Sequence, residues 1–133
     1  MQKFMCLVYF DDQSFAGMTD AEDKALTDAT IEEDRQLRAE GKLILAQPLQ
    51  DPRTAVSVRV KGGKVVRTDG PFAETKEWLG GFTLLLARDM EEAVAISAAS
   101  EITKRGRVEI RPVLEQTHSV SGVGRPAISE TGA

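Results

Sequence analysis

The stretch KFMCLVYF, residues 3–10, is apolar at every position after its first lysine. Successive side chains of an extended strand alternate between its two faces. The even-numbered residues from Phe4 to Phe10 therefore point one way, and the odd-numbered residues from Met5 to Tyr9 point the other. Both sets are apolar, so we expect both faces of this strand to be buried.

A second strand of the same kind is predicted at GFTLLLA, residues 81–87. Two helices accompany these strands. Thr19 and Glu22 form a capping box for the first helix, which ends where Gly41 suits the left-handed C′ position. Asp89 caps the second helix, which we expect to run until Gly106.

Shorter strands complete the prediction, at residues 43–46, 56–61, 65–68 and 108–113, with a Gly62-Gly63 hairpin turn between the middle two. The order of elements predicts an α+β fold, a ferredoxin-like antiparallel sheet with both helices on one face. Two helices cover only that face. Because the other face is also apolar, we expect a second copy of the chain to cover it, giving a homodimer.

Size and composition are those of one small domain of 133 residues, with 41% hydrophobic and 29% charged residues. The net charge of −4 is concentrated in residues 11–40, which hold ten acids and three bases. This acidity argues against a nucleic-acid partner. No stretch approaches the length of a membrane span, and the apolar start is too short for a signal peptide. We therefore expect a cytoplasmic protein without a membrane partner.

The segment TDGPFAETKEWLGG, residues 68–81, is too elaborate for a plain connection between strands. In a purely structural role, Asp69 accepts hydrogen bonds from the turn that Pro71 begins, while Phe72 and Trp78 fix the loop by burial. In a functional role, the same turn presents N–H groups to a ligand. We expect Asp69 to be mainly structural.

Charged side chains after that turn are the candidates for chemistry. Glu74 and Lys76 are two residues apart, and a carboxylate beside a cation is suited to proton transfer. We predict these two as catalytic residues. Asp69, Arg111 and Tyr9 are predicted to bind the ligand, a small anionic or carbonyl compound that Arg111 would hold through two hydrogen bonds.

Cysteine and histidine are too few for a metal centre. Cys6 lies within the first apolar strand and is expected to be a core side chain. His118, the single histidine, lies near the end of the chain without partner ligands. No nucleotide-binding glycine motif or nucleophile elbow is present, so we expect neither a metal nor another cofactor.

The run TDGPFAETKE at residues 68–77, followed by LGGF at 79–82, resembles the signature of the DGPF group of YCII-related proteins. The opening KFMCLVYF and the closing VEIRPV at residues 108–113 resemble the first and last strands of that family. The resemblance covers residues 1–114, which we take as the domain, and leaves 115–133 as a tail or arm. It implies a dimeric α+β barrel.

The family also bears on function. Shorter YCII-type relatives carry a His and an Asp proposed as an acid/base pair, but here Thr30 or Ile31 stands where that His is expected. A histidine-based mechanism is therefore not predicted. Two functions stay open: a small-molecule-binding protein, in one form a cofactor-independent acid/base enzyme, and a non-catalytic regulatory protein. The second follows from the resemblance of DGPF proteins to accessory partners of extracytoplasmic-function sigma factors.

Overall fold

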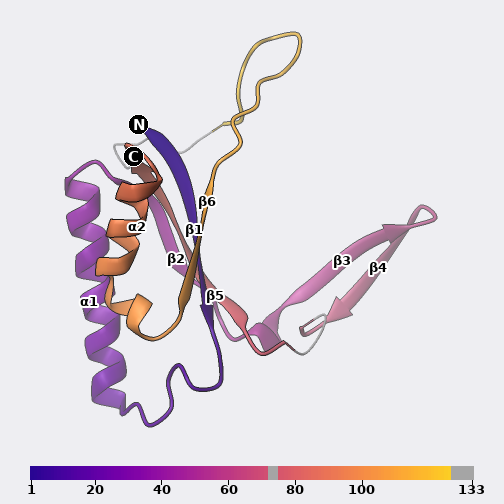
Figure 1. Cartoon of the computed structure of the whole chain (residues 1–133). Helices are drawn as coiled ribbons and strands as arrows, with labels where there is room; N and C mark the ends of the chain where they lie inside the picture. The colour runs from indigo at the N-terminus through magenta and orange to yellow at the C-terminus, as the bar shows by residue number, and fades with distance from the viewer. Residues whose placement is uncertain (72–74, 127–133) are drawn as a thin grey trace.

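A computed structural model describes residues 1–71 and 75–126 (Figure 1). The elements along these residues are strands, α-helices and two short 3₁₀ helices, η1 and η2. They are β1 (Gln2–Phe10), α1 (Asp20–Ala39), β2 (Leu43–Pro48), η1 (Pro52–Thr54), β3 (Val56–Lys61), β4 (Lys64–Asp69), β5 (Trp78–Ala87), α2 (Met90–Ala99), η2 (Glu101–Lys104) and β6 (Arg107–Pro112).

Four strands form one antiparallel sheet in the order β2-β5-β1-β6, and both helices lie on the same face of it (Figure 1). The predicted α+β, ferredoxin-like fold is thus confirmed. The β3–β4 hairpin forms a separate two-stranded sheet. Its turn residues, Gly62 and Gly63, both have positive φ, as the hairpin turn requires.

Helix ends follow the capping residues in three of four cases. The Thr19 and Asp89 side chains accept hydrogen bonds from Glu22 N and Glu92 N, and Gly41 has a φ of +74° after α1. The expectation that the second helix continues to Gly106 is wrong. It ends at Ala99, because Ser100 is extended and starts η2 instead. No proline or glycine marks this break in the sequence.

The core lies between the sheet and the helices. On β1 the even-numbered side chains are buried there, with Phe4 1% and Cys6 3% exposed. Cys6 packs with Leu43 and Leu85, while Phe4 packs with Ala87 and Ala93. The expectation that Cys6 is a core side chain is therefore confirmed.

The other face of the sheet, called the open face here, has no helix over it (Figure 1). Met5 of β1 lies opposite Leu84 of β5, and Leu7 lies opposite Phe82. These side chains, together with Leu45 of β2, are only partly buried within one chain. A continuous apolar surface thus remains across the three strands.

Helix α1 packs loosely for its length. It has twenty residues, yet none of them is buried. Arg38 Nη1 donates to the Ile44 carbonyl, and Leu37 packs on the core. Across residues 1–71 and 75–126, no helix has the length and apolar character needed to cross a membrane.

Candidate functional site

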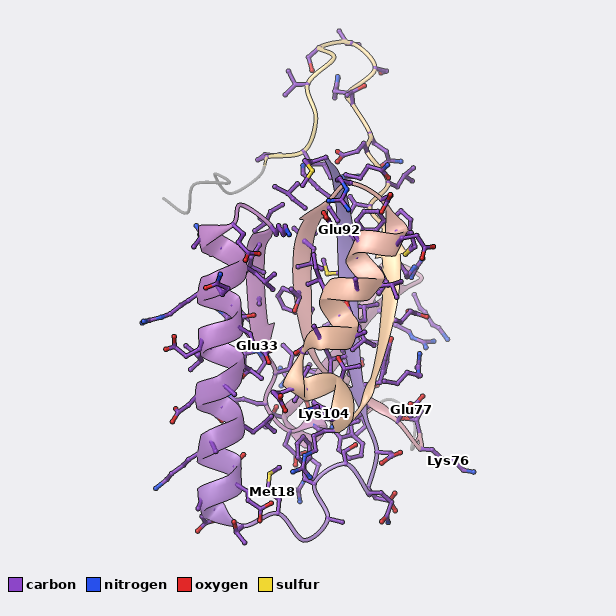
Figure 2. The ribbon with its side chains drawn as sticks, turned by 60° about the vertical axis from the view of Figure 1, so that its left-hand side comes forward. Met18, Glu33, Lys76, Glu77, Glu92 and Lys104 are labelled. Carbon is purple, nitrogen blue, oxygen red and sulfur yellow. The ribbon has the colours of Figure 1, made fainter. Side chains whose placement is uncertain are left out.

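A groove of about 610 Å³ lies between α1 and α2 on the helix side of the sheet. Its floor comes from the strands and its walls from the helices, which lie side by side in Figure 2. The floor includes Cys6, Val8, Thr83, Leu85 and Val108. The groove takes the place of close packing between α1 and the sheet. This explains why no residue of α1 is buried.

Glu33 joins the two helical walls. Its Oε2 accepts a hydrogen bond from Ser100 Oγ at 2.8 Å, and its Oε1 accepts one from Glu101 N at 2.9 Å. Ser100 follows the last residue of α2 and caps the start of η2, so Glu33 accepts hydrogen bonds from the Ser100 hydroxyl and from an N–H group that the first turn of η2 leaves free. The carboxylate of Glu33, turned toward α2 in Figure 2, fixes the width of the groove at this point.

Asp34 lines the groove beside Glu33. Partial burial raises the pKa of the Asp34 carboxyl, and the neighbouring negative charge of Glu33 raises it further. Within the described part of the chain, no hydrogen bond or ion pair is seen for this carboxyl group. A carboxyl with a raised pKa in a groove has the properties of a general acid or base.

Cys6 and Ser97 meet on the floor of the groove. The Cys6 Sγ and Ser97 Oγ atoms are 3.6 Å apart, and either can donate the hydrogen bond. Burial raises the pKa of the Cys6 thiol, and the contact with Ser97 only partly opposes this shift. The thiol is therefore protonated at neutral pH and is unsuited to act as a nucleophile.

Acidic groups predominate around the groove. Five acids line it, against the two bases Lys42 and Arg88. They are Glu33, Asp34, Asp89, Glu91 and Glu92. Glu92 is 8% exposed, pairs with the Arg88 guanidinium and accepts a hydrogen bond from Arg88 N. The balance of charge disfavours an anion in this groove.

A second polar cluster lies at the end of the loop of residues 68–77, where β5 begins. Arg107 donates to both carboxylate oxygens of Glu77, at 3.0 to 3.3 Å, and its guanidinium carbon lies 4.6 Å from the centre of the Tyr9 ring. The hydrogen bonds to Glu77 are the largest cause that raises the pKa of Arg107. Tyr9 also pairs with Leu79 of β5, so it lies next to the loop.

The other predicted site residues are spread over the molecule. Asp69 Oδ1 accepts from Arg67 Nε at 2.8 Å on the exposed hairpin, and Lys76 points outward (Figure 2). Arg111 of β6 lies opposite Met5 of β1. It is four residues from Arg107, which lies opposite Tyr9. Glu74 and Phe72 lie outside the described residues.

The sequence analysis missed Glu33 and Asp34, although the sequence held a signal for Glu33. Leu26, Ala29 and Leu37 form the thin apolar stripe of α1, and Glu33 falls within that stripe at helical spacing. An acid on the inner side of a helix is unusual unless it has a partner. The local excess of acids in residues 11–40 concealed this one position.

Neither polar cluster has the composition of a metal centre. Over residues 1–71 and 75–126, no group of three or more His, Cys, Asp or Glu side chains could hold a metal ion. His118 Nδ1 instead accepts hydrogen bonds from Val120 N and Ser121 N in the terminal segment.

Comparison with known proteins identifies the family. The chain matches the YCII-related domain over residues 2–117. It is also 30% identical, over 112 residues, to an uncharacterised protein of Rhizobium meliloti (strain 1021), which covers 83% of this chain and 90% of that protein. The match includes β1 to β6 and both helices, so the chain belongs to the YCII-related family.

Proposed function

We propose that the groove between α1 and α2 binds a small organic molecule, and that Asp34 exchanges a proton with it. The observation that supports this most is the pairing of an open groove of about 610 Å³ with a carboxyl group of raised pKa on its wall. The volume falls within the range of small-molecule sites. The Cys6 and Leu85 side chains supply an apolar floor, as such sites usually have.

Of the two ligand classes expected from the sequence, a neutral carbonyl compound fits this groove better than an anion. Five acids against two bases repel a negative charge. In its protonated form Asp34 can donate a hydrogen bond to a carbonyl oxygen. In its ionised form it can remove a proton from the carbon next to that carbonyl group.

The loop remains the rival location. Tyr9, Arg107 and Glu77 form a polar cluster there, and Lys76 is exposed beside it. In this second version Glu74 and Lys76 are the catalytic pair, and Asp69, Tyr9 and Arg111 contact the ligand. The two locations favour ligands of different charge. The loop cluster contains the cations Arg107 and Lys76, which would attract an anion, whereas the groove is mainly acidic.

A titration followed by NMR distinguishes the two locations. We expect neutral ketones and lactones to shift the amide signals of Ser97 and Thr103, and carboxylates to leave them unchanged. Ala95→Trp should abolish these shifts because Ala95 lines the groove. Ala98→Trp places the same bulk on an exposed position of α2 outside the lining and is the matched control. Shifts confined to Tyr9, Lys76 and Arg107 would move the site to the loop.

Asp34→Asn should remove proton transfer while making the protein slightly more stable at pH 7. Because the folded protein raises the pKa of Asp34, folding favours its protonated form. The favourable contribution is complete below the ordinary Asp pKa of about 3.9 and is lost as the pH rises through the folded-state value. The gain at pH 7 should be well under about 1 kcal/mol, because solvent screens this partly exposed group.

Thermal melts at pH 7 and pH 3 measure this effect. The variant should melt above the natural protein at pH 7, and the difference should vanish at pH 3. Asp28→Asn removes the same charge from an exposed position of α1 and controls for net charge. A variant less stable at pH 7 would show that Asp34 has a structural role that conflicts with the proposal.

A regulatory function is the alternative, with a sigma factor as the partner. The feature in its favour is α1, whose outer side is exposed and whose twenty residues include seven acids and three bases. Such a surface would bind a basic segment of another protein. Charge reversal at Glu32 and Asp28, both exposed, would weaken that binding and leave the groove unaffected.

We also propose that the open face is covered by a second copy of the chain. Met5, Leu7, Phe82 and Leu84 lie together there, and large contiguous apolar patches mark interaction sites. Two identical sheets stacked face to face would bury this surface around a two-fold axis. The dimer would leave both grooves accessible, since they lie on the helix side.

A further inference from the structure

The β3–β4 hairpin has two chemically different faces. Residues directly opposite each other in the ladder lie on the same face. One face carries four valines beside an ion pair, and the other carries three bases beside a single valine. The valine face holds Val56, Val58, Val60 and Val65 together with the paired Arg67 and Asp69, and the basic face holds Arg59, Lys61, Lys64 and Val66.

The valine face is largely exposed within one chain. Val58, Val60 and Val65 retain 65%, 68% and 72% of their accessible surface. A single two-stranded hairpin is marginally stable in water unless a hydrophobic face is covered. An antiparallel sheet with one apolar and one charged face normally has the apolar face packed. These valines therefore form an exposed apolar row that a partner can cover.

The position of the hairpin indicates which surface this is. The hairpin leaves the body where β5 begins and projects away from the side on which the helices lie (Figure 1). It therefore extends on the same side as the open face. Six residues in each strand give it a length of about 20 Å, whereas stacked sheets lie about 10 Å apart. It is long enough to pass across the whole sheet layer of a molecule stacked on the open face.

We propose that the hairpin is a dimerisation arm whose valine face packs against a second copy of the chain. The open face is apolar, and the hairpin that carries the valines projects on the same side of the molecule, so one partner can cover both. Two-fold symmetry supplies that partner without any other protein, because each copy offers one sheet and one arm to the other. Lys61 and Lys64 lie on the opposite face of the arm and stay in water.

Two adjacent residues allow a matched test. Val65 lies on the valine face, and Val66, its neighbour in β4, lies on the basic face opposite Arg59. In one chain Val66 is less exposed than Val65, at 42% against 72%. If burial within one chain alone determined the effect, Val66→Lys would destabilise the protein more than Val65→Lys. If the arm packs on a partner, Val65→Lys is the more harmful one for assembly.

Sedimentation equilibrium of the full chain, with circular dichroism to verify folding, measures the dimer Kd. We expect Val65→Lys to raise the Kd at least tenfold and Val66→Lys to change it less than threefold. Val60→Thr combined with Val65→Thr keeps the shape and β propensity of both residues, and should raise the Kd in the same direction if the lysine variant does not fold. Hydrogen exchange of the hairpin amides should slow as protein concentration rises through the Kd.

The inference rests on the proposed dimer and is independent of the groove. A natural protein that stays monomeric at tens of micromolar would overturn both the dimer and the arm. A dimer whose Kd responds to Leu84→Lys but not to the valine variants would overturn the arm alone. Equal effects of Val65→Lys and Val66→Lys on the dimer Kd would also overturn the arm. So would hydrogen exchange of the hairpin amides that does not change with protein concentration.

Discussion

We expect Leu85→Lys to unfold the protein, whereas Leu84→Lys should leave it folded and separate the proposed dimer. Leu85 is 1% exposed and packs with Cys6 and Leu43 on the helix side of the sheet. An unpaired charge there costs more than about 5 kcal/mol, which equals or exceeds the lower range of stability for a small domain. Because neighbouring residues of a strand face opposite ways, Leu84 lies on the open face instead.

The effect of Leu84→Lys should fall mainly on assembly. Leu84 is partly exposed in one chain and lies between Met5 and Leu45. A two-fold interface contains each substitution twice, so two buried lysines at about 2 kcal/mol each would raise the dimer Kd about 1,000-fold. The folded monomer should lose only about 1 kcal/mol, as for ordinary surface changes.

Light scattering after gel filtration and thermal melts separate these outcomes. Val94→Lys is the control, because Val94 is 44% exposed on α2, away from both apolar surfaces. It should change neither the mass nor the melting temperature by much. If Leu84→Lys remained a dimer at low micromolar concentration, the open face would not be the interface.

The fold was predictable because its signals are local and agree with one another. The alternation in residues 3–10 gives the two faces of β1, and Thr19 and Asp89 give the two helix starts. The separation of the β3–β4 hairpin from the main sheet was not predictable. Alternating valines show that a strand has an apolar face, but not which surface covers it.

The groove was harder to predict because it depends on how α1 is held. The break at Ser100 has no proline or glycine to announce it, and it is stabilised by Glu33, 67 residues earlier. Such a contact has no signature in a single sequence. The conspicuous loop drew the functional prediction to Glu74 and Lys76, whereas the carboxyl group with the raised pKa lies on a helix whose many acids made it look like solvated surface.

Gly106→Ala is expected to be the most damaging of the glycine substitutions in this chain. A Cβ atom at Gly106 would lie under 3.0 Å from both the Tyr9 carbonyl oxygen and the Phe10 ring. The carbonyl cannot withdraw easily, because Tyr9 pairs with Arg107 in the sheet. The cost should be about 3 kcal/mol, at the upper end of overpacking effects. Since Tyr9 also lies beneath the Arg107 guanidinium, the same shift would disturb the loop cluster.

Two further glycines serve as comparisons for Gly106 in urea denaturation. Gly80→Ala meets only the Phe10 side chain, which can move in part, so its cost should be about 1–2 kcal/mol. Gly124→Ala has its nearest neighbour at 3.6 Å and should stay within about 0.5 kcal/mol. The expected order is therefore Gly106, then Gly80, then Gly124. A Gly106→Ala variant as stable as Gly124→Ala would mean that β1 and β6 do not approach as closely as their pairing requires.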